Sequence, residues 1–225
     1  MTLLLLSAGA ARAAPWEEGS AAYQRGDYAA AIKSFQLAAA EGDVRAQFNI
    51  GSMYENGRGV PRDYTEALKW YHLAAAQDDP GAQTNIGLMY EDGRGVPQDY
   101  DEAIKWYRLA TAQGYASALT NLGAMYEKGH GVSQDYATAL RYYRRAAGQR
   151  QGIALYNLGA VYETGRGVPQ NYIRAHMWYT LADEVGYAPG EAKRDIIAKN
   201  MTTQQVSEAH EMALECRLRN FKHCD

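Results

Sequence analysis

GRGVPQDY, at residues 93–100, is the stretch on which the fold depends, because the chain carries it four times. The other copies are GRGVPRDY at 57–64, GHGVSQDY at 129–136 and GRGVPQNY at 165–172. Each copy begins 36 residues after the one before it, with no insertion or deletion. A constant period in this range is typical of repeat architectures, in which each unit buries its apolar face against its neighbours.

Other positions keep the same step of 36 residues, and we refer to each such set as a column. Six columns besides the octapeptide glycines stay in phase over four copies, which excludes a chance match. The columns used below are Gly51, Gly87, Gly123 and Gly159; Glu55, Glu91, Glu127 and Glu163; and Tyr71, Tyr107, Tyr143 and Tyr179.

The residues before each octapeptide predict a helix, which we call helix A of the repeat. In the first full copy, residues 44–56 read VRAQFNIGSMYEN, with apolar residues recurring at helical spacing. Gly51 falls in the middle of this helix, where glycine costs about 1 kcal/mol relative to alanine. Because the glycine recurs in every copy, we expect another backbone to pack closely against it.

The octapeptide itself predicts a sharp turn followed by a second helix, helix B. Two glycines two residues apart allow positive φ angles, and Pro61 stops helix A. Asp63 is then a suitable N-cap for helix B at about 64–77, with Glu66 completing a pair that resembles a capping box. The motif lacks the Lys-Ser/Thr of a phosphate-binding P-loop, and nothing before it predicts a strand, so nucleotide binding is not expected.

An aromatic pair recurs in helix B, and we interpret it as core. Buried rings fill the space between layers, provided that each polar tip finds a partner. The alternative interpretation is a platform on which sugars or bases stack. The pairs are Trp70-Tyr71, Trp106-Tyr107, Tyr142-Tyr143 and Trp178-Tyr179.

Composition excludes several classes of function. The 225 residues are 47% hydrophobic and 22% charged, which is ordinary for a globular protein. A formal net charge of −3 gives no electrostatic case for nucleic-acid binding. No stretch reaches the roughly 18 apolar residues that span a bilayer, so the protein is not expected to be transmembrane.

The first 14 residues predict a signal peptide or a clipped leader. Leu3–Leu6 form a short apolar run, and Ala11-Arg12-Ala13 fits the A-x-A form of a signal-peptidase site. No basic residue precedes the leucines, so the leader looks shortened. The alternative is simply a frayed apolar N-terminus.

The repeat, A-x-x-x-I/L-G-x-x-Y-E-x-G-x-G-V-x-x-D-Y-x-x-A-x-x-W/Y-Y-x-x-A, resembles the Sel-one-like repeat (SLR), a relative of the tetratricopeptide repeat. The match covers about 43–187, and residues 15–42 look like a shortened first copy that caps the array. The resemblance implies an all-α fold, a right-handed α-solenoid of antiparallel helix pairs. The solenoid would span 15–187 and be followed by a C-terminal helical cap at 188–225.

The resemblance also implies where a partner would bind. By analogy with tetratricopeptide grooves, the helix A residues beside the invariant ones face the concave side, and they form a mildly apolar surface suited to a peptide or a partner helix. The expected partner-binding residues are Arg45, Phe48, Ser52, Glu55, Thr84, Leu88, Glu91, Thr120, Glu127, Tyr156 and Glu163.

The two cysteines lie in the C-terminal segment, eight residues apart. On one continuous helix their Cα atoms would be about 12 Å apart, and a disulfide needs less than about 7 Å. If Cys216 and Cys224 pair, the helix must therefore end between them, near Arg219-Asn220. The alternative is a metal site that also uses His210 and His223, although this spacing matches no standard zinc pattern.

No arrangement of residues predicts catalysis, a cofactor or a metal. The histidines form neither a triad nor an HExxH motif. The glutamate column recurs in every layer, which favours a structural task over ligand contact. The resemblance implies a non-catalytic adaptor or scaffold that binds another protein, with roles in envelope signalling or polysaccharide export. The leader and the cysteines predict that it is exported to the periplasm or secreted. The alternatives are a cell-wall glycan binder or enzyme, and a cytoplasmic protein with free thiols.

Overall fold

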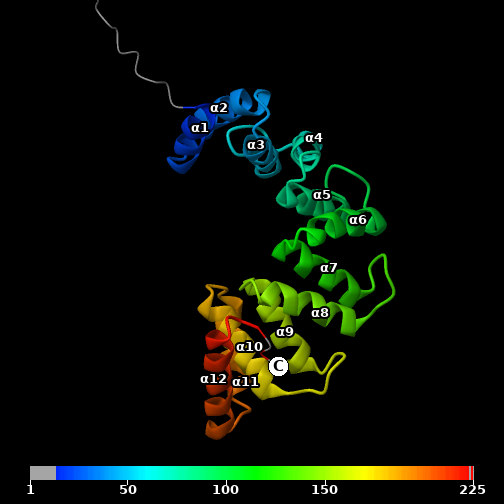
Figure 1. The fold of residues 1–225 in the computed structure, drawn as a ribbon, viewed down its shortest axis with the longest axis vertical. Helices are drawn as coiled ribbons and strands as arrows, with labels where there is room; N and C mark the ends of the chain where they lie inside the picture. The colour runs from blue at the N-terminus through cyan, green and yellow to red at the C-terminus, as the bar shows by residue number, and fades with distance from the viewer. Residues whose placement is uncertain (1–13, 223, 225) are drawn as a thin grey trace, which may run out of the picture. The chain divides into compact units, whose positions relative to one another are not determined.

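The computed structural model describes residues 14–222 and 224, and across these residues the chain is helical with no strand (Figure 1). The predicted all-α class is confirmed. Apart from Ala14, the leader predicted over residues 1–14 lies outside the described residues. The helices are α1 Pro15–Gln24, α2 Tyr28–Ala40, α3 Val44–Asn56, α4 Tyr64–Ala75, α5 Pro80–Asp92, α6 Tyr100–Ala112, α7 Ala116–Lys128, α8 Tyr136–Ala147, α9 Gly152–Thr164, α10 Tyr172–Glu184, α11 Pro189–Ala198 and α12 Thr203–Leu218.

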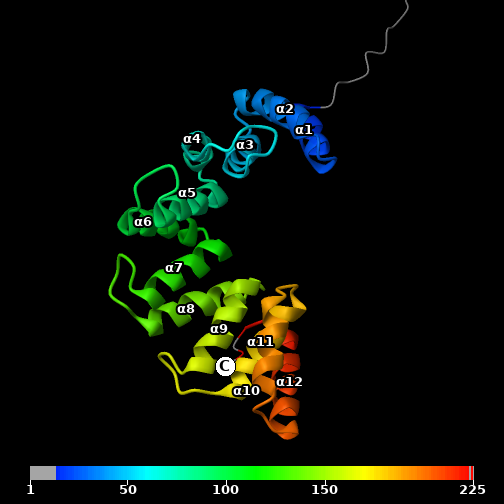
Figure 2. The same ribbon diagram turned by 180° about the vertical axis from the view of Figure 1, so that it is seen from behind.

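These helices belong to two compact units, Met1–Ala82 and Gln83–Asp225, and the boundary falls within α5. In the first unit, α1 packs against α2, α2 against α3, and α3 against α4. In the second unit, contacts run in chain order from α6 to α10, and α10 also contacts α11 and α12 (Figure 2). Consecutive helices are therefore neighbours within each unit, as stacked helix pairs require.

Each octapeptide forms a turn and a helix cap, as predicted. At the start of α4, α6, α8 and α10, the cap side chain accepts a hydrogen bond of 2.9–3.0 Å from the backbone N–H three residues later. In the expected capping box, Glu66 and Glu102 would accept a hydrogen bond from the backbone N–H of the cap residue. They instead form ion pairs of 2.7 Å with Lys69 and Lys105. The four caps are Asp63, Asp99, Asp135 and Asn171.

The second glycine of the loop permits a close contact with the preceding helix pair. Gly59 has a φ of 73°, and a Cβ there would lie 2.6 Å from main-chain atoms of Tyr28, at the start of α2. A side chain at this position would both strain the backbone and collide with that helix. The loop after α3 therefore rests directly on the helix pair before it.

The glycine in the middle of each A helix packs most closely against a tyrosine ring, and the expected backbone neighbour also approaches closely at Gly87 and Gly123. A Cβ at Gly159 would lie 2.6 Å from ring atoms of Tyr179. At Gly123 the Tyr143 ring is likewise nearer, at 2.7 Å, than the Ala139 carbonyl at 3.3 Å. The glycine column thus makes room for the tyrosine column of helix B.

Replacing Gly159 with alanine is expected to lower the free energy of unfolding by up to about 2 kcal/mol. Helix propensity alone would raise it by about 1 kcal/mol, but the added Cβ overpacks the Tyr179 ring, which typically costs about 1–3 kcal/mol. Urea unfolding followed by circular dichroism measures the difference. Gly148→Ala is the control, because a Cβ there meets nothing nearer than 3.6 Å. A more stable Gly159→Ala variant would contradict the packing argument.

The C-terminal helices cover the end of the second unit, as expected of a cap. In three earlier repeats a leucine on helix B is about half exposed, at 49–52%. Its counterpart Leu181 on α10 is fully buried, in one cluster with Ile197 of α11 and Ala213 of α12. The helices α11 and α12 therefore bury the apolar face that the last repeat would otherwise expose. The half-exposed counterparts are Leu37, Leu73 and Leu109.

The cysteines form a disulfide, Cys216–Cys224, with their Cα atoms 5.0 Å apart. The helix α12 ends at Leu218, between the two cysteines, as pairing requires. Phe221 folds back with its backbone N–H donating to the Cys216 carbonyl at 2.9 Å, and its ring is buried. The described residues contain no cluster of three or more potential metal ligands, and His223, named in the metal alternative, lies outside them.

Removing this disulfide is expected to lower the free energy of unfolding by about 2.5 kcal/mol in the chain-entropy model for so short a loop. The measurement is urea unfolding of the oxidised protein, the reduced protein and a Cys216→Ser/Cys224→Ser variant. Reductant should have no further effect on the double variant. Equal stability of the oxidised and reduced proteins would contradict the expectation.

Candidate functional site

The expected partner-binding residues lie on α3 in the first unit and on α5, α7 and α9 in the second. We call the side of these four helices that carries them the A-helix surface.

In the first unit, the A-helix surface carries a cationic side chain and an aromatic one, and each lies against an aromatic ring. Arg45 is exposed, forms a 2.6 Å ion pair with Asp43 and lies 4.3 Å from the centroid of the Trp16 ring. The Arg45 guanidinium holds the pKa of the Asp43 carboxyl below its ordinary value. Phe48 is half-buried, with its ring centroid 5.7 Å from that of Tyr71.

In the second unit, the expected residues divide into accessible and buried ones. Leu88 is half-buried, and so is Tyr156, which packs 5.2 Å from the Tyr179 ring, centroid to centroid. Thr84 and Thr120 are only 3% exposed. The Thr120 hydroxyl donates to the Ala116 carbonyl at 2.9 Å, within its own helix. The two threonines therefore face the interior rather than the surface.

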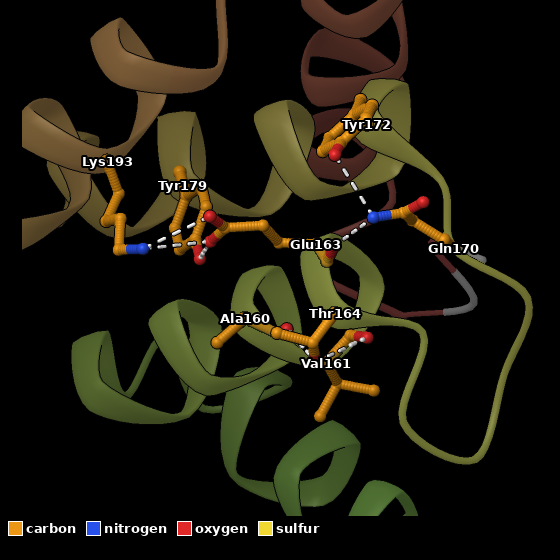
Figure 3. Close-up of polar contacts among 8 residues, drawn as sticks. All are labelled: Ala160, Val161, Glu163, Thr164, Gln170, Tyr172, Tyr179 and Lys193. Carbon is orange, nitrogen blue, oxygen red and sulfur yellow. Dashed lines mark hydrogen bonds and ion pairs between the residues drawn. The ribbon is translucent and has the colours of Figure 1, made fainter.

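The glutamate column binds the buried tyrosine column. In each repeat the tyrosine hydroxyl donates to the glutamate carboxylate at 2.5–2.7 Å, and the four tyrosine side chains are fully buried. Figure 3 shows this for Tyr179 and Glu163, with Lys193 of α11 at 3.1 Å from the same carboxylate. Each glutamate thus satisfies a buried phenol, which supports the structural interpretation of the column.

Burial and the neighbouring carboxylate change the acidity of these tyrosines. Burial, followed by the charge of Glu91, raises the pKa of the Tyr107 hydroxyl far above its ordinary value. The pKa values of Tyr143 and Tyr179 are raised in the same way, with burial as the largest cause. These phenols therefore stay protonated as donors and have no role as general bases.

The tryptophan half of the aromatic column is less uniform. Tyr71 and its three counterparts are core, which confirms the interpretation for the tyrosines. Trp70 and Trp106 are half-buried, whereas Trp178 is only 2% exposed. The fully buried tyrosines leave no continuous ring platform on which a sugar or base could stack.

A hollow of about 590 Å³ opens on the A-helix surface of the second unit. Glu127 of α7, one of the expected partner-binding residues, lines it, together with Ala124 of the same helix and Asn157 of α9. Arg166, from the loop after α9, forms a 3.1 Å ion pair with Glu127 at the same place. The hollow also contains residues that sequence reasoning missed, namely Lys128, Gln134, Tyr136 and Arg166.

This hollow offers both donors and acceptors within a small volume. Guanidinium, ammonium and amide groups donate, and the Glu127 carboxylate accepts. Such a mixture suits the alternating N–H and C=O groups of an extended peptide, with small apolar contacts at Ala124. A signal for the loop contribution was present in the sequence, since Arg58, Arg94 and Arg166 occupy one column.

None of the helices in the described part of the chain is long and apolar enough to cross a membrane. Within the described residues, no triad of nucleophile, base and orienting group accompanies the hollow.

The protein-family model of the Sel1 repeat matches residues 44–79, 80–115, 116–150 and 152–182. No curated protein matches the chain. Among solved structures, a Sel1 repeat protein from Oxalobacter formigenes is 30% identical, with a TM-score of 0.74. The alignment covers 89% of this chain and 99% of that one.

Two further solved structures are similar. A protective antigen with an SLR fold from uropathogenic Escherichia coli is 30% identical, with a TM-score of 0.71. The alignment covers 92% of this chain but only 46% of the antigen, so this chain spans about half of the antigen's length. An immunity protein from Pseudomonas aeruginosa is 21% identical, with a TM-score of 0.58 over 92% of this chain and 83% of its own, a likeness of fold alone.

Proposed function

Because the chain belongs to the Sel1 repeat family, whose members generally mediate protein–protein interaction, we propose that it is a non-catalytic adaptor that binds a partner protein on its A-helix surface. The bound element is a peptide segment or a helix of the partner. Proteins of envelope signalling or polysaccharide export are the proposed partner class, as the resemblance implies.

The hollow beside Ala124 and Glu127 is the observation that carries this proposal. It is lined by residues on the side expected to face a partner, and several of its lining positions hold different residues in different repeats. Surface residues that differ between repeats provide specificity, whereas the invariant tyrosine and glutamate columns hold the helices together. A segment lying over the hollow would extend toward Leu88 on α5 and Tyr156 on α9, two apolar side chains of this surface in the second unit.

The alternative of a cell-wall glycan binder or enzyme has less support. It needs exposed rings for sugar stacking or a free pair of carboxylates. The tyrosine column is buried and each glutamate of its column accepts a phenolic hydrogen bond. These contacts favour the adaptor over a glycan binder, and glycan binding is one outcome of the experiment.

Export to the bacterial periplasm, or secretion, is part of the proposal. The apolar run Leu3–Leu6 followed by Ala11-Arg12-Ala13 supports it, and so does the disulfide, because disulfides persist in oxidising compartments. Alkylation of the denatured protein, taken from its native cells without reductant, tests the location. Blocked cysteines are expected, and two free thiols would favour the cytoplasmic alternative.

The adaptor proposal is tested by photocrosslinking in the native cells. A photoreactive amino acid replaces Ala124, which lines the hollow, or Leu88 beside it. The matched control replaces Lys105 on α6, which is exposed on a B helix of the same unit. Mass spectrometry identifies the adducts.

A discrete protein adduct at Ala124 or Leu88, absent at Lys105, is the expected result. If the same proteins were crosslinked from all three positions, the contacts would be nonspecific, which would contradict the proposal. If folded, correctly located protein gives no protein adduct, the adaptor function fails. Binding of the same protein to purified cell-wall glycan would then favour the alternative.

A further inference from the structure

A second cavity lies in the Gln83–Asp225 unit and shares no lining residue with the hollow described above. Its volume is about 560 Å³, within the range of roughly 300–1,000 Å³ found for pockets that bind small molecules. The end of α8, the middle of α10 and the tail after α12 form its walls. The largely buried aromatic side chains of Trp178 and Phe221 are among its lining residues.

The cavity is lined by three cationic side chains. Arg144 and Arg145 come from the last turn of α8, and Lys222 comes from the tail. Arg144 also donates to the Tyr162 hydroxyl at 3.3 Å, so it is held in place. None of the described residues that line the cavity is acidic. A cavity with this balance attracts an anion.

A buried donor in the wall lacks an acceptor. Trp178 is only 2% exposed, and its Nε1–H has no hydrogen-bond partner among the described residues. A buried indole N–H normally finds a partner, and leaving it unmet is unfavourable. An acceptor oxygen of a ligand in this cavity would satisfy it, which is an indication of binding that does not depend on the charges.

The repeat itself does not demand a cation at position 145. The same column holds Leu37, Leu73 and Leu109 in the earlier copies and Leu181 in the last one. Arginine replaces leucine only in the α8 copy, where this side chain lines the cavity. The charge therefore belongs to the cavity rather than to the packing of the repeat.

We propose that this cavity binds a small organic anion, a carboxylate or phosphate group attached to a compact apolar body. The apolar body packs between Trp178 and Phe221. The acidic group takes the Trp178 N–H and the charge of Arg145 and Lys222. This site is separate from the proposed partner surface, so either one stands if the other fails.

The disulfide links this site to redox state. Phe221, Lys222 and Cys224 all lie within or beside the loop that Cys216–Cys224 closes, and all three line the cavity. Reduction frees the segment that forms one wall. Binding of the anion is therefore expected to weaken when the disulfide is broken.

Titration followed by NMR of the tryptophan indole N–H signals tests the proposal. The Trp178 signal is assigned by its loss in Trp178→Phe. The probes are 1-naphthoate and 1-naphthyl phosphate, which differ in the acidic group, with neutral 1-naphthamide and inorganic phosphate as comparisons. A saturable shift of the Trp178 signal is expected with one or both naphthyl anions, and the better one identifies the acidic group.

Variants of the same protein make the test specific. Arg145→Gln is expected to weaken naphthyl-anion binding about tenfold or more, as for loss of a charge-assisted hydrogen bond. Arg108→Gln, one repeat earlier on α6 and outside the cavity, should bind like the unmodified protein. Cys216→Ser/Cys224→Ser should also weaken binding about tenfold.

Several results would overturn the proposal. One is the absence of any saturable Trp178 shift with either anion. Another is equal binding of 1-naphthamide, which would remove the role of charge. An equal shift with inorganic phosphate would remove the role of the apolar body. Equal losses in Arg145→Gln and Arg108→Gln would show a general charge effect. Because Arg145 is exposed, its variant tests the site even if the double serine variant does not fold.

Discussion

Lowering the pH from about 6.5 to about 4 is expected to reduce the free energy of unfolding by up to about 3 kcal/mol through one residue, His176. Burial, with smaller contributions from His210 and Arg194, lowers the pKa of the His176 imidazole to about 4. The side chain is only 2% exposed. In the folded protein it stays neutral over this range, whereas in the unfolded chain it takes up a proton.

The sign follows from that difference. Between the two pKa values the unfolded chain binds more protons than the folded protein, so acid favours unfolding. The contribution of His176 to stability is fully present above about pH 6.5 and is lost as the pH falls toward about 4. The surroundings offer little to reverse this, since the charged groups nearby are His210 on α12 and Arg194 and Asp195 on α11.

Urea unfolding at steps between pH 7.5 and pH 4 measures the effect. A His176→Gln variant should lose most of the pH dependence in this window, because glutamine does not titrate. His72→Gln, on α4 of the first unit, is the control and should keep it. Parallel pH profiles for the unmodified protein and His176→Gln would show that the histidine is not responsible.

Replacing Glu91 with leucine is expected to lower the free energy of unfolding by about 3 kcal/mol. The Tyr107 hydroxyl is fully buried and donates to Glu91 at 2.6 Å. Hydrogen bonds to charged groups contribute about 1.5–3 kcal/mol, and a buried donor left without an acceptor adds a penalty of similar size. The loss should therefore exceed that of an ordinary surface substitution, which is usually within about 0.5 kcal/mol.

A double-mutant cycle separates the hydrogen bond from other effects of the substitution. Tyr107→Phe removes the donor, so Glu91→Leu should cost at least about 1 kcal/mol less in that background. Glu102→Leu at the start of α6 is the control, since Glu102 is half-buried and its carboxylate forms a 2.7 Å ion pair with Lys105 rather than a bond to Tyr107. Additive losses in the cycle would mean that the pair is not coupled.

The repeat period predicted most of the fold because the same contacts recur in every repeat and therefore appear in the sequence as columns of identical residues. A step of 36 residues fixed the helix pairs, the turns and the caps such as Asp63, and the resemblance to the Sel-one-like repeat is confirmed by the family match. The reason for Gly51 was missed. Helical spacing shows that something approaches the glycine, but it does not tell a backbone from the Tyr71 ring on the next helix.

The site was predictable only in part. The analogy with tetratricopeptide grooves indicated which positions of the A helices to choose, but not how deeply each side chain is buried. Glu127 and Tyr156 are half-buried, whereas Thr84 and Thr120 are turned inward. The loop residue Arg166 completes the hollow from outside the helices, where the analogy has no counterpart. The second cavity depends on the tail folding back at Phe221, which the spacing of the cysteines allows but does not specify.

The pairing of Gly51 and Glu55 with Tyr71 is complete within a single repeat. An in-frame duplication or loss of one 36-residue stretch of the gene therefore copies or deletes both halves of each such contact together. Arrays of different length can arise without any new pair of residues having to evolve. The four uninterrupted copies at constant spacing are consistent with such a history.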